Sequence, residues 1–188
     1  MLEKISTLDS ELLVFLNGLG STTYDGFWLL ITKQLVWMPF FLLLVYLLYK
    51  KFGWKQLLII LGFVAVLILF TDQTANLFKA TFQRNRPCND PELAGIIRIV
   101  KPGSTYSFFS GHAINSMATT TFVFLFLRKY YQYTFFVFVF PLLFGFSRIY
   151  LGLHFPADIL TGYLFGIAYG ILFYKLHQYF QPKYFPIN

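Results

Sequence analysis

The stretch Ser147–Asp158, SRIYLGLHFPAD, places an arginine, a histidine and an aspartate between two long apolar segments. These side chains are costly in hydrocarbon, so we expect them at the ends of two spanning helices, kept there for a function. His154 and Asp158 are four residues apart, and Pro156 between them suits the first position of a helix. The stretch therefore predicts a helix that begins near Pro156 and carries both side chains at its start.

The whole chain has the composition of an integral membrane protein. Of its 188 residues, 57% are hydrophobic and 12% are charged, whereas soluble domains carry about 25% charged residues. The net charge of +7 comes without a long basic run, which favours loop anchoring over nucleic-acid binding. We expect an all-α, membrane-embedded helical bundle that forms a single domain over residues 1–188.

Hydrophobic segments near the length needed to cross a bilayer recur along the chain. Residues 5–19 are apolar at helical spacing but too short to span, and Ser6 with Asp9 resembles a capping box, so an amphipathic helix in the membrane interface is expected. Residues 20–26 read as a linker. The alternative is a sixth span over residues 8–25. The five expected spans are residues 28–49, 57–76, 108–127, 130–146 and 156–174.

The charges of the short loops predict the orientation of these spans. Loops at one end carry basic residues and no acid, which is typical of the cytoplasmic side; they contain Lys50, Lys51, Lys55, Arg128, Lys129, Lys175 and Lys183. Three polar clusters, residues 79–87, 107–112 and 147–158, fall at the opposite end. We therefore expect these clusters to converge on the outward-facing end of the bundle.

The cations and backbone donors of the three clusters suit a phosphate group. Lys79 and Arg86 are seven residues apart, or two helical turns, so both are expected on one face. Arg148 adds a planar fork that can bind phosphate through two hydrogen bonds. Ser110 and Gly111 open a span, where free N–H groups and the helix dipole favour an anion.

Two histidines complete a candidate catalytic set beside this phosphate site. The Asp158 carboxylate can hold one ring nitrogen of His154 and leave the other free to attack phosphorus. His112, on another span, could protonate the leaving oxygen. With three histidines, one cysteine and no carboxylate pair at ligand spacing, neither a metal site nor a cofactor is expected.

These residues resemble the signatures of the type 2 phosphatidic acid phosphatase family of membrane lipid phosphatases. Lys79 with Arg86-Pro87 matches the first signature; FSGH, with Phe109 in a proline position, matches the second except at that residue. Ser147-Arg148, His154 and Asp158 match the third. The resemblance implies that His154 is a nucleophile forming a phosphohistidine, that Asp158 orients it and that His112 is the general acid. It implies phosphate binding by Lys79, Arg86, Ser110, Gly111 and Arg148.

The resemblance also implies a substrate class and a location. We expect a multi-pass protein of a bacterial inner membrane that hydrolyses a lipid phosphate or diphosphate on the periplasmic or outer side, with undecaprenyl diphosphate as the first substrate. Phosphatidylglycerophosphate and lipid A are the alternatives. A lipid phosphotransferase and a non-catalytic lipid-binding protein are the rival functions, and no obligate protein partner is expected.

Several polar residues outside the signatures receive expectations of their own. Asp72 and Asn76 share a helical stripe with Lys79 and are expected to support the site rather than contact substrate. Arg84, Arg98 and Lys101 either bind a second phosphate or headgroup or pair with Asp90 and Glu92 in a solvated loop. His177, at the far end of the last span, reads as an interface residue.

Overall fold

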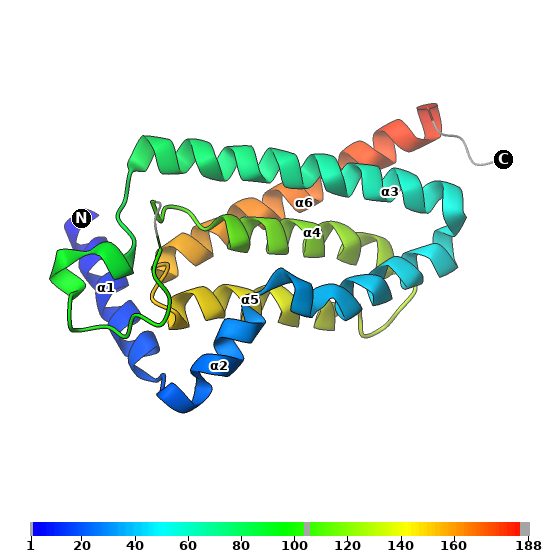
Figure 1. Ribbon diagram of the computed structural model, residues 1–188. Helices are drawn as coiled ribbons and strands as arrows, with labels where there is room; N and C mark the ends of the chain where they lie inside the picture. The colour runs from blue at the N-terminus through cyan, green and yellow to red at the C-terminus, as the bar shows by residue number, and fades with distance from the viewer. Residues whose placement is uncertain (1, 104–105, 185–188) are drawn as a thin grey trace.

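The computed structural model describes residues 2–103 and 106–184, and these residues form helices, 3-10 turns and loops without a strand (Figure 1). The all-helical expectation is confirmed. The elements in chain order are α1 Leu2–Gly18, α2 Thr22–Ile31, η1 Gln34–Trp37, α3 Met38–Phe82, η2 Pro87–Asn89, η3 Pro91–Leu93, α4 Gly111–Leu127, η4 Thr134–Phe138, α5 Val139–Tyr150 and α6 Pro156–Tyr184.

Helix α3 is a hairpin of two helical rods. Gly53 interrupts it with φ of 72° and ψ of 177°, and Figure 1 shows the chain reversing its direction at that end of the bundle. A positive φ is accessible to glycine without the steric cost of a Cβ. The first rod begins at Met38, so it covers only the second half of the expected span 28–49, whose first residues belong to α2 and η1. The second rod contains the expected span 57–76 and continues to Phe82.

Within residues 2–103 and 106–184, two apolar helical stretches have the length and composition to cross a membrane. They are Gln34–Leu93, which contains the reversal at Gly53, and Pro156–Lys183. The stretch Thr134–Tyr150 is apolar but shorter. The number of crossings therefore stays a prediction. Helix α1 lies across one end of the bundle in Figure 1, beside the loop that follows α3.

The closest packing in the bundle joins α4 to α6 through glycine. A Cβ on Gly162 would lie 2.9 Å from the Ala113 Cβ and 3.0 Å from the Ser110 carbonyl oxygen. Gly166 and Gly170 are equally tight against α4 backbone oxygens, at 2.9 Å and 2.7 Å. Small residues every four positions let two membrane helices approach closely. The stripe therefore holds the start of α4 against the start of α6.

Both ends of this helix pair can be followed in Figure 1. The end of α3, the loop residues 83–103 and 106–110, and the starts of α4 and α6 meet at one end, where α1 and α2 also lie. The reversal at Gly53 and the end of α6 lie at the opposite end. Between them, α3, α4 and α6 share an aromatic and aliphatic core that includes Leu57, Ile60, Phe122, Leu127 and Phe173.

Three local expectations about the ends of the chain are wrong. Residues 20–26 are not a linker, because α2 begins at Thr22. Ser6 and Asp9 do not cap a helix, because α1 begins at Leu2 and Asp9 bonds to residues outside the helix. His177 is not an interface residue: it is 6% exposed and packs edge-on against the rings of Phe63 and Phe126.

Candidate active site

A tight turn after α5 brings Arg148 and His154 to the same place. The N–H of Leu153 donates to the Arg148 carbonyl and that of Gly152 to the Ile149 carbonyl, both at 3.0 Å. This pair of bonds, with Gly152 at φ of 76°, is the Schellman arrangement that ends a helix at a left-handed glycine. The chain then re-enters a helix at Pro156, as the sequence predicted.

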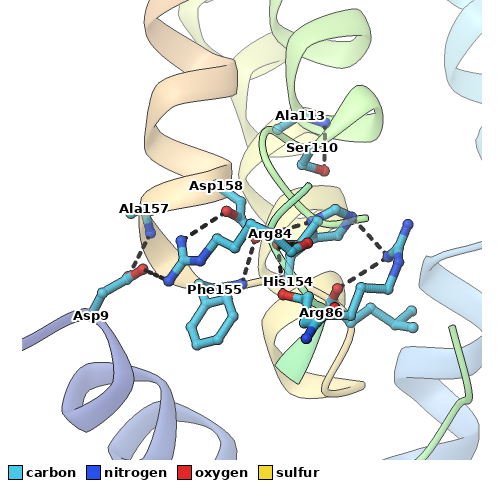
Figure 2. Close-up of polar contacts among 12 residues, drawn as sticks. Asp9, Arg84, Arg86, Ser110, Ala113, His154, Phe155, Ala157 and Asp158 are labelled. Carbon is cyan, nitrogen blue, oxygen red and sulfur yellow. Dashed lines mark hydrogen bonds and ion pairs between the residues drawn. The ribbon is translucent and has the colours of Figure 1, made fainter. Parts of the chain in front are cut away.

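His154 lies between a carboxylate and a guanidinium (Figure 2). Its Nδ1 is 3.3 Å from Asp158 Oδ2, and its Nε2 is 3.1 Å from Arg86 Nη1. Asp158 Oδ2 also accepts from the Phe155 N–H at 2.9 Å. Arginine can only donate, so Nε2 accepts and the proton of the neutral ring sits on Nδ1. The four-residue spacing predicted that Asp158 would hold one ring nitrogen of His154, and the structure shows this nitrogen to be Nδ1.

The surroundings of His154 keep its ring uncharged. The residue is 1% exposed, and burial lowers the pKa of His154 to about 4. Asp158 acts in the opposite direction, while the charges of Arg86 and Arg148 lower the pKa further. At neutral pH the imidazole therefore carries a lone pair on Nε2, the form required of a nucleophile.

The start of α4 provides an open cradle beside Lys79. Ser110 is the N-cap of α4, and its hydroxyl accepts from the Ala113 N–H at 3.4 Å. The Ser110 N–H donates to the backbone carbonyl of Asp158 at 3.2 Å, which ties the starts of α4 and α6 together. A Cβ on Gly111 would have only the Ala75 Cβ and the Lys79 Nζ as neighbours, both at 3.9 Å. This space beside a helix N-terminus and an ammonium suits an anion.

Lys79 and Arg86 reach the site differently from the expected helical stripe. Helix α3 ends at Phe82, and Gln83 adopts the left-handed conformation with φ of 46°. Arg86 is therefore in a loop, so the two-turn argument is wrong although Lys79 and Arg86 still interact electrostatically. Gly103 packs closely against the Arg86 side chain, since a Cβ on Gly103 would lie 2.6 Å from the Arg86 Cδ.

Arg148 is a buried cation whose hydrogen bonding is incomplete. Its Nη1 donates to the Thr32 hydroxyl at 2.9 Å, while its Nε is buried and unpartnered among the described residues. The ion pairs found in residues 2–103 and 106–184 do not include Arg148. A buried cation without a counter-ion is costly, so an anion bound here would offset that cost.

His112 lies on the first turn of α4, against the same group of charges. Its ring centroid is 5.3 Å from that of Phe144, and it interacts electrostatically with Arg148, His154 and Lys79. All eight site residues predicted from the sequence thus belong to elements that meet at one end of the bundle. Residues 2–103 and 106–184 hold no group of three His, Cys, Asp or Glu side chains arranged to bind a metal.

Comparison with known proteins assigns the chain to a family. The sequence profile of the PAP2 superfamily matches residues 54–182. The chain belongs to the PAP2 superfamily. Two proteins named lipid A 4'-phosphatase are similar to it: that of Bacteroides thetaiotaomicron is 35% identical over 93% of this chain and 79% of the relative. That of Porphyromonas gingivalis is 31% identical over 97% of this chain and 78% of the relative.

Solved structures of the superfamily share the fold. Aquifex aeolicus LpxE matches with a TM-score of 0.69 and 26% identity, over 89% of this chain and 95% of that one. The transmembrane PAP2-type phosphatidylglycerolphosphate phosphatase of Bacillus subtilis matches with a TM-score of 0.69 and 20% identity, over 98% of this chain and 90% of that one. The chain is therefore a PAP2 lipid phosphatase and a membrane protein, which favours an enzyme over the non-catalytic lipid-binding alternative.

Sequence reasoning missed the contacts of two residues, Arg84 and Asp9, that are not among the matched PAP2 signature residues. Arg84 places Nη2 at 2.7 Å from Asp9 Oδ2 and Nη1 at 3.0 Å from Asp158 Oδ1 (Figure 2). It was expected to bind a second phosphate or to pair with Asp90 or Glu92, and neither alternative describes its two ion pairs. Asp9 was interpreted as the partner of Ser6 in a capping box, and that local pattern gives no signal for a contact with α6.

Two further polar expectations have clear outcomes in this PAP2 chain. Arg98 pairs with Asp25 rather than with the loop acids, through Nη2 at 2.8 Å and 2.9 Å from its carboxylate oxygens. Asp72 accepts from Asn115 Nδ2 at 2.6 Å and attracts the charge of Lys79. Asp72 thus connects Lys79 to α4, in agreement with a supporting role.

Proposed function

We propose that this PAP2 lipid phosphatase removes the 4'-phosphate of lipid A through a phosphohistidine intermediate. The observation that carries the chemistry is the buried neutral His154, which is held by Asp158 and faces the phosphate-binding cations through Nε2. The substrate rests on the two relatives named lipid A 4'-phosphatase, each matched over more than three quarters of its length.

The residues allow each bond change to be assigned. His154 Nε2 attacks phosphorus while the bond from phosphorus to the sugar oxygen breaks, and His112 gives that oxygen a proton. The Nδ1–H bond to Asp158 stabilises the cationic ring that forms. A water molecule then attacks the phosphohistidine, passes its proton to His112 and releases inorganic phosphate, which restores both histidines.

The cations of the site have the complementary task. Lys79, Arg86 and Arg148, with the start of α4 at Gly111, would stabilise the charge that spreads over the phosphoryl oxygens in the transition state. Arg148 Nε, which is unpartnered among the described residues, would gain an acceptor. Phosphate binding would thus supply counter-charge that the resting site lacks.

Undecaprenyl diphosphate, the substrate expected first from the sequence, is less well supported than lipid A. The named relatives favour the alternative that the sequence reading left open, since both are lipid A 4'-phosphatases. The chemistry at phosphorus is the same for a monoester and a diphosphate. The choice among lipids is therefore made by groups around the reacting phosphate rather than by the catalytic residues.

The proposed location is a bacterial inner membrane with the site facing the periplasm. The support is the charge of the loops: the end opposite the site carries Lys50, Lys51, Arg128 and Lys129 and no acid, as cytoplasmic loops do.

Cysteine accessibility tests this orientation. A cysteine introduced at Asn89, which is exposed at the site end, should react with an impermeant maleimide in intact spheroplasts in a Cys88→Ala background. Labelling only after lysis would reverse the orientation.

The decisive experiment measures phosphate release by the detergent-purified protein. Lipid A with a 4'-phosphate, undecaprenyl diphosphate and phosphatidylglycerophosphate are supplied separately, with and without EDTA. Release from lipid A that survives EDTA and disappears in His154→Ala is expected, with mass spectrometry placing the loss at the 4' position. His177→Asn, a buried histidine at the other end of the bundle, is the matched control. Release from another lipid alone would overturn the lipid A assignment, and release by His154→Ala would overturn the phosphohistidine.

A further inference from the structure

Helix α1 has two faces that differ in chemistry. Leu8, Leu12 and Phe15, with Leu19 directly after the helix, are 44–65% exposed and form an apolar stripe on the outside. Asp9, Leu13 and Asn17, spaced by four residues on another face, are 7%, 0% and 0% exposed. A helix that only floats in the interface would turn its polar residues to water. Here two polar residues, Asp9 and Asn17, point into the protein, while Lys4, Ser6, Thr7 and Glu11 are exposed.

Polar contacts connect the buried face of α1 to the Asp158 carboxylate. Asp9 Oδ1 accepts from the Ala157 N–H at 2.8 Å, in the first turn of α6, and Asp9 Oδ2 accepts from Arg84 at 2.7 Å. Arg84 then donates to Asp158 Oδ1 at 3.0 Å, and Figure 2 shows the three side chains in line. The side chains of Asp9 and Asp158 are 6% and 0% exposed. Removing one charge from such a buried network is more costly than removing an exposed charge, because it leaves its partner buried without a counter-charge.

The position of Arg84 is fixed from several sides. Its guanidinium lies 3.7 Å from the centroid of the Phe155 ring, and its carbonyl accepts from the Ser107 N–H at 2.8 Å. Each of its terminal nitrogens donates to a different carboxylate, an arrangement that the rigid planar fork of arginine holds in a fixed geometry. Asp158 consequently presents Oδ1 to Arg84 and Oδ2 to His154 Nδ1.

We propose that Asp9 and Arg84 are positioning residues, which hold Asp158 in the orientation that fixes the tautomer and aim of His154. Without the Asp9 charge, Arg84 has Asp158 as its remaining ion-pair partner among the described residues and competes with His154 for Oδ2. The proposal rests on the proposed phosphohistidine chemistry and adds two residues to it, one of them from the N-terminal helix.

The test uses Asp9→Asn in the full-length protein. Asparagine keeps an oxygen for the Ala157 N–H and loses the charge that engages Arg84, so α6 keeps its start. We expect kcat to fall about 10- to 100-fold while KM changes less than twofold, because the phosphate ligands are untouched. Asp25→Asn is the matched control, since it breaks an Asp–Arg pair that lies outside the site, and it should leave kcat within twofold. An unchanged kcat in Asp9→Asn, or an equal loss in Asp25→Asn, would overturn the proposal.

A double-mutant cycle separates positioning from a general loss of fold. If Asp9 acts through Asp158, then Asp9→Asn costs little further activity in an Asp158→Asn background. A loss in that background as large as in the wild type would show that Asp9 acts by another route. These kinetic tests require lipid hydrolysis that depends on His154. If His154→Ala still hydrolysed the lipid, the proposed function would be wrong, and the positioning role would be tested by the measurement below.

A measurement that needs no turnover tests the positioning role of Asp9 separately from the proposed hydrolysis. Nitrogen-15 NMR of histidine-labelled protein in micelles reports which ring nitrogen carries the proton, with His154→Gln giving the assignment. The wild type should show His154 protonated on Nδ1, and Asp9→Asn should populate the other tautomer. The same tautomer in both proteins would overturn the positioning role even if no lipid were hydrolysed.

Discussion

The Nε2 atom of His154 lies 3.1 Å from Nη1 of Arg86, so the proposed nucleophile is covered by a residue proposed to bind phosphate. Arg86 also donates from Nη1 to the Leu153 carbonyl at 3.1 Å, and Gly103 packs against its stem. In the resting enzyme Arg86 thus satisfies the lone pair of His154. Phosphate oxygens, which accept charge-assisted hydrogen bonds, would draw the guanidinium away and uncover Nε2.

Replacing Arg86 by lysine should therefore impair both binding and chemistry. An ammonium is a point charge without the planar fork that can serve the Leu153 carbonyl and a phosphate together. We expect KM to rise and kcat/KM to fall at least tenfold, measured by phosphate release over a range of lipid concentrations. Arg128→Lys, at the end of α4 away from the site, is the control. Equal kinetics for Arg86→Lys and wild type would remove Arg86 from the phosphate site.

Gly111→Ala should weaken phosphate binding without unfolding the protein. The added Cβ would meet only ordinary contacts, at 3.9 Å from the Ala75 Cβ and the Lys79 Nζ, but it would occupy the space proposed for phosphate. Inhibition by orthovanadate, followed by titration, should weaken about tenfold, while the Tm stays close to that of the wild type. Unaltered inhibition would place the phosphate elsewhere.

Two glycine substitutions on α6 should separate stability from activity. In Gly162→Ala and Gly170→Ala the new Cβ clashes with α4, at 2.9 Å and 2.7 Å from its nearest atoms, and such overpacking costs about 1–3 kcal/mol. Both variants should lower the Tm. Only Gly162 lies against the Ser110 carbonyl, at 3.0 Å, so only Gly162→Ala should also lower kcat/KM. Equal kinetics in the two folded variants would contradict this division.

The stability of the protein should fall on acidification through His154. Burial lowers its pKa from 6.5 to about 4, so between these values the unfolded chain binds a proton that the folded protein refuses. The contribution of neutral His154 to the free energy of unfolding is fully present above pH 6.5 and is lost as the pH falls toward 4. The total loss is about 3 kcal/mol, because each pH unit between the two pKa values changes the free energy by about 1.4 kcal/mol. Thermal unfolding in detergent should show a shallower pH slope for His154→Gln than for the wild type. Parallel slopes would mean that His154 is not buried in a neutral state.

The sequence was informative wherever a local pattern carries the physics. Apolar length predicted helices, and the spacing of Pro156 between His154 and Asp158 predicted a helix start with an oriented ring, which the 3.3 Å contact matches. The three polar clusters predicted one active end. Helical spacing wrongly predicted that Lys79 and Arg86 share one helix face, because α3 ends at Phe82. The sequence QRNRP, residues 83–87, did not reveal where the helix ends.

The sequence by itself determined an all-helical membrane chain, its family signatures and eight candidate site residues. Only the tertiary structure decided that the glycines of α6 press α4 against it, that Thr32 holds Arg148 and that Asp9 reaches the start of α6, which is 148 positions away in the chain. The reason is physical: hydropathy and helical spacing are properties of neighbouring residues. A buried ion pair between distant segments exists only after packing has excluded water and fixed both partners.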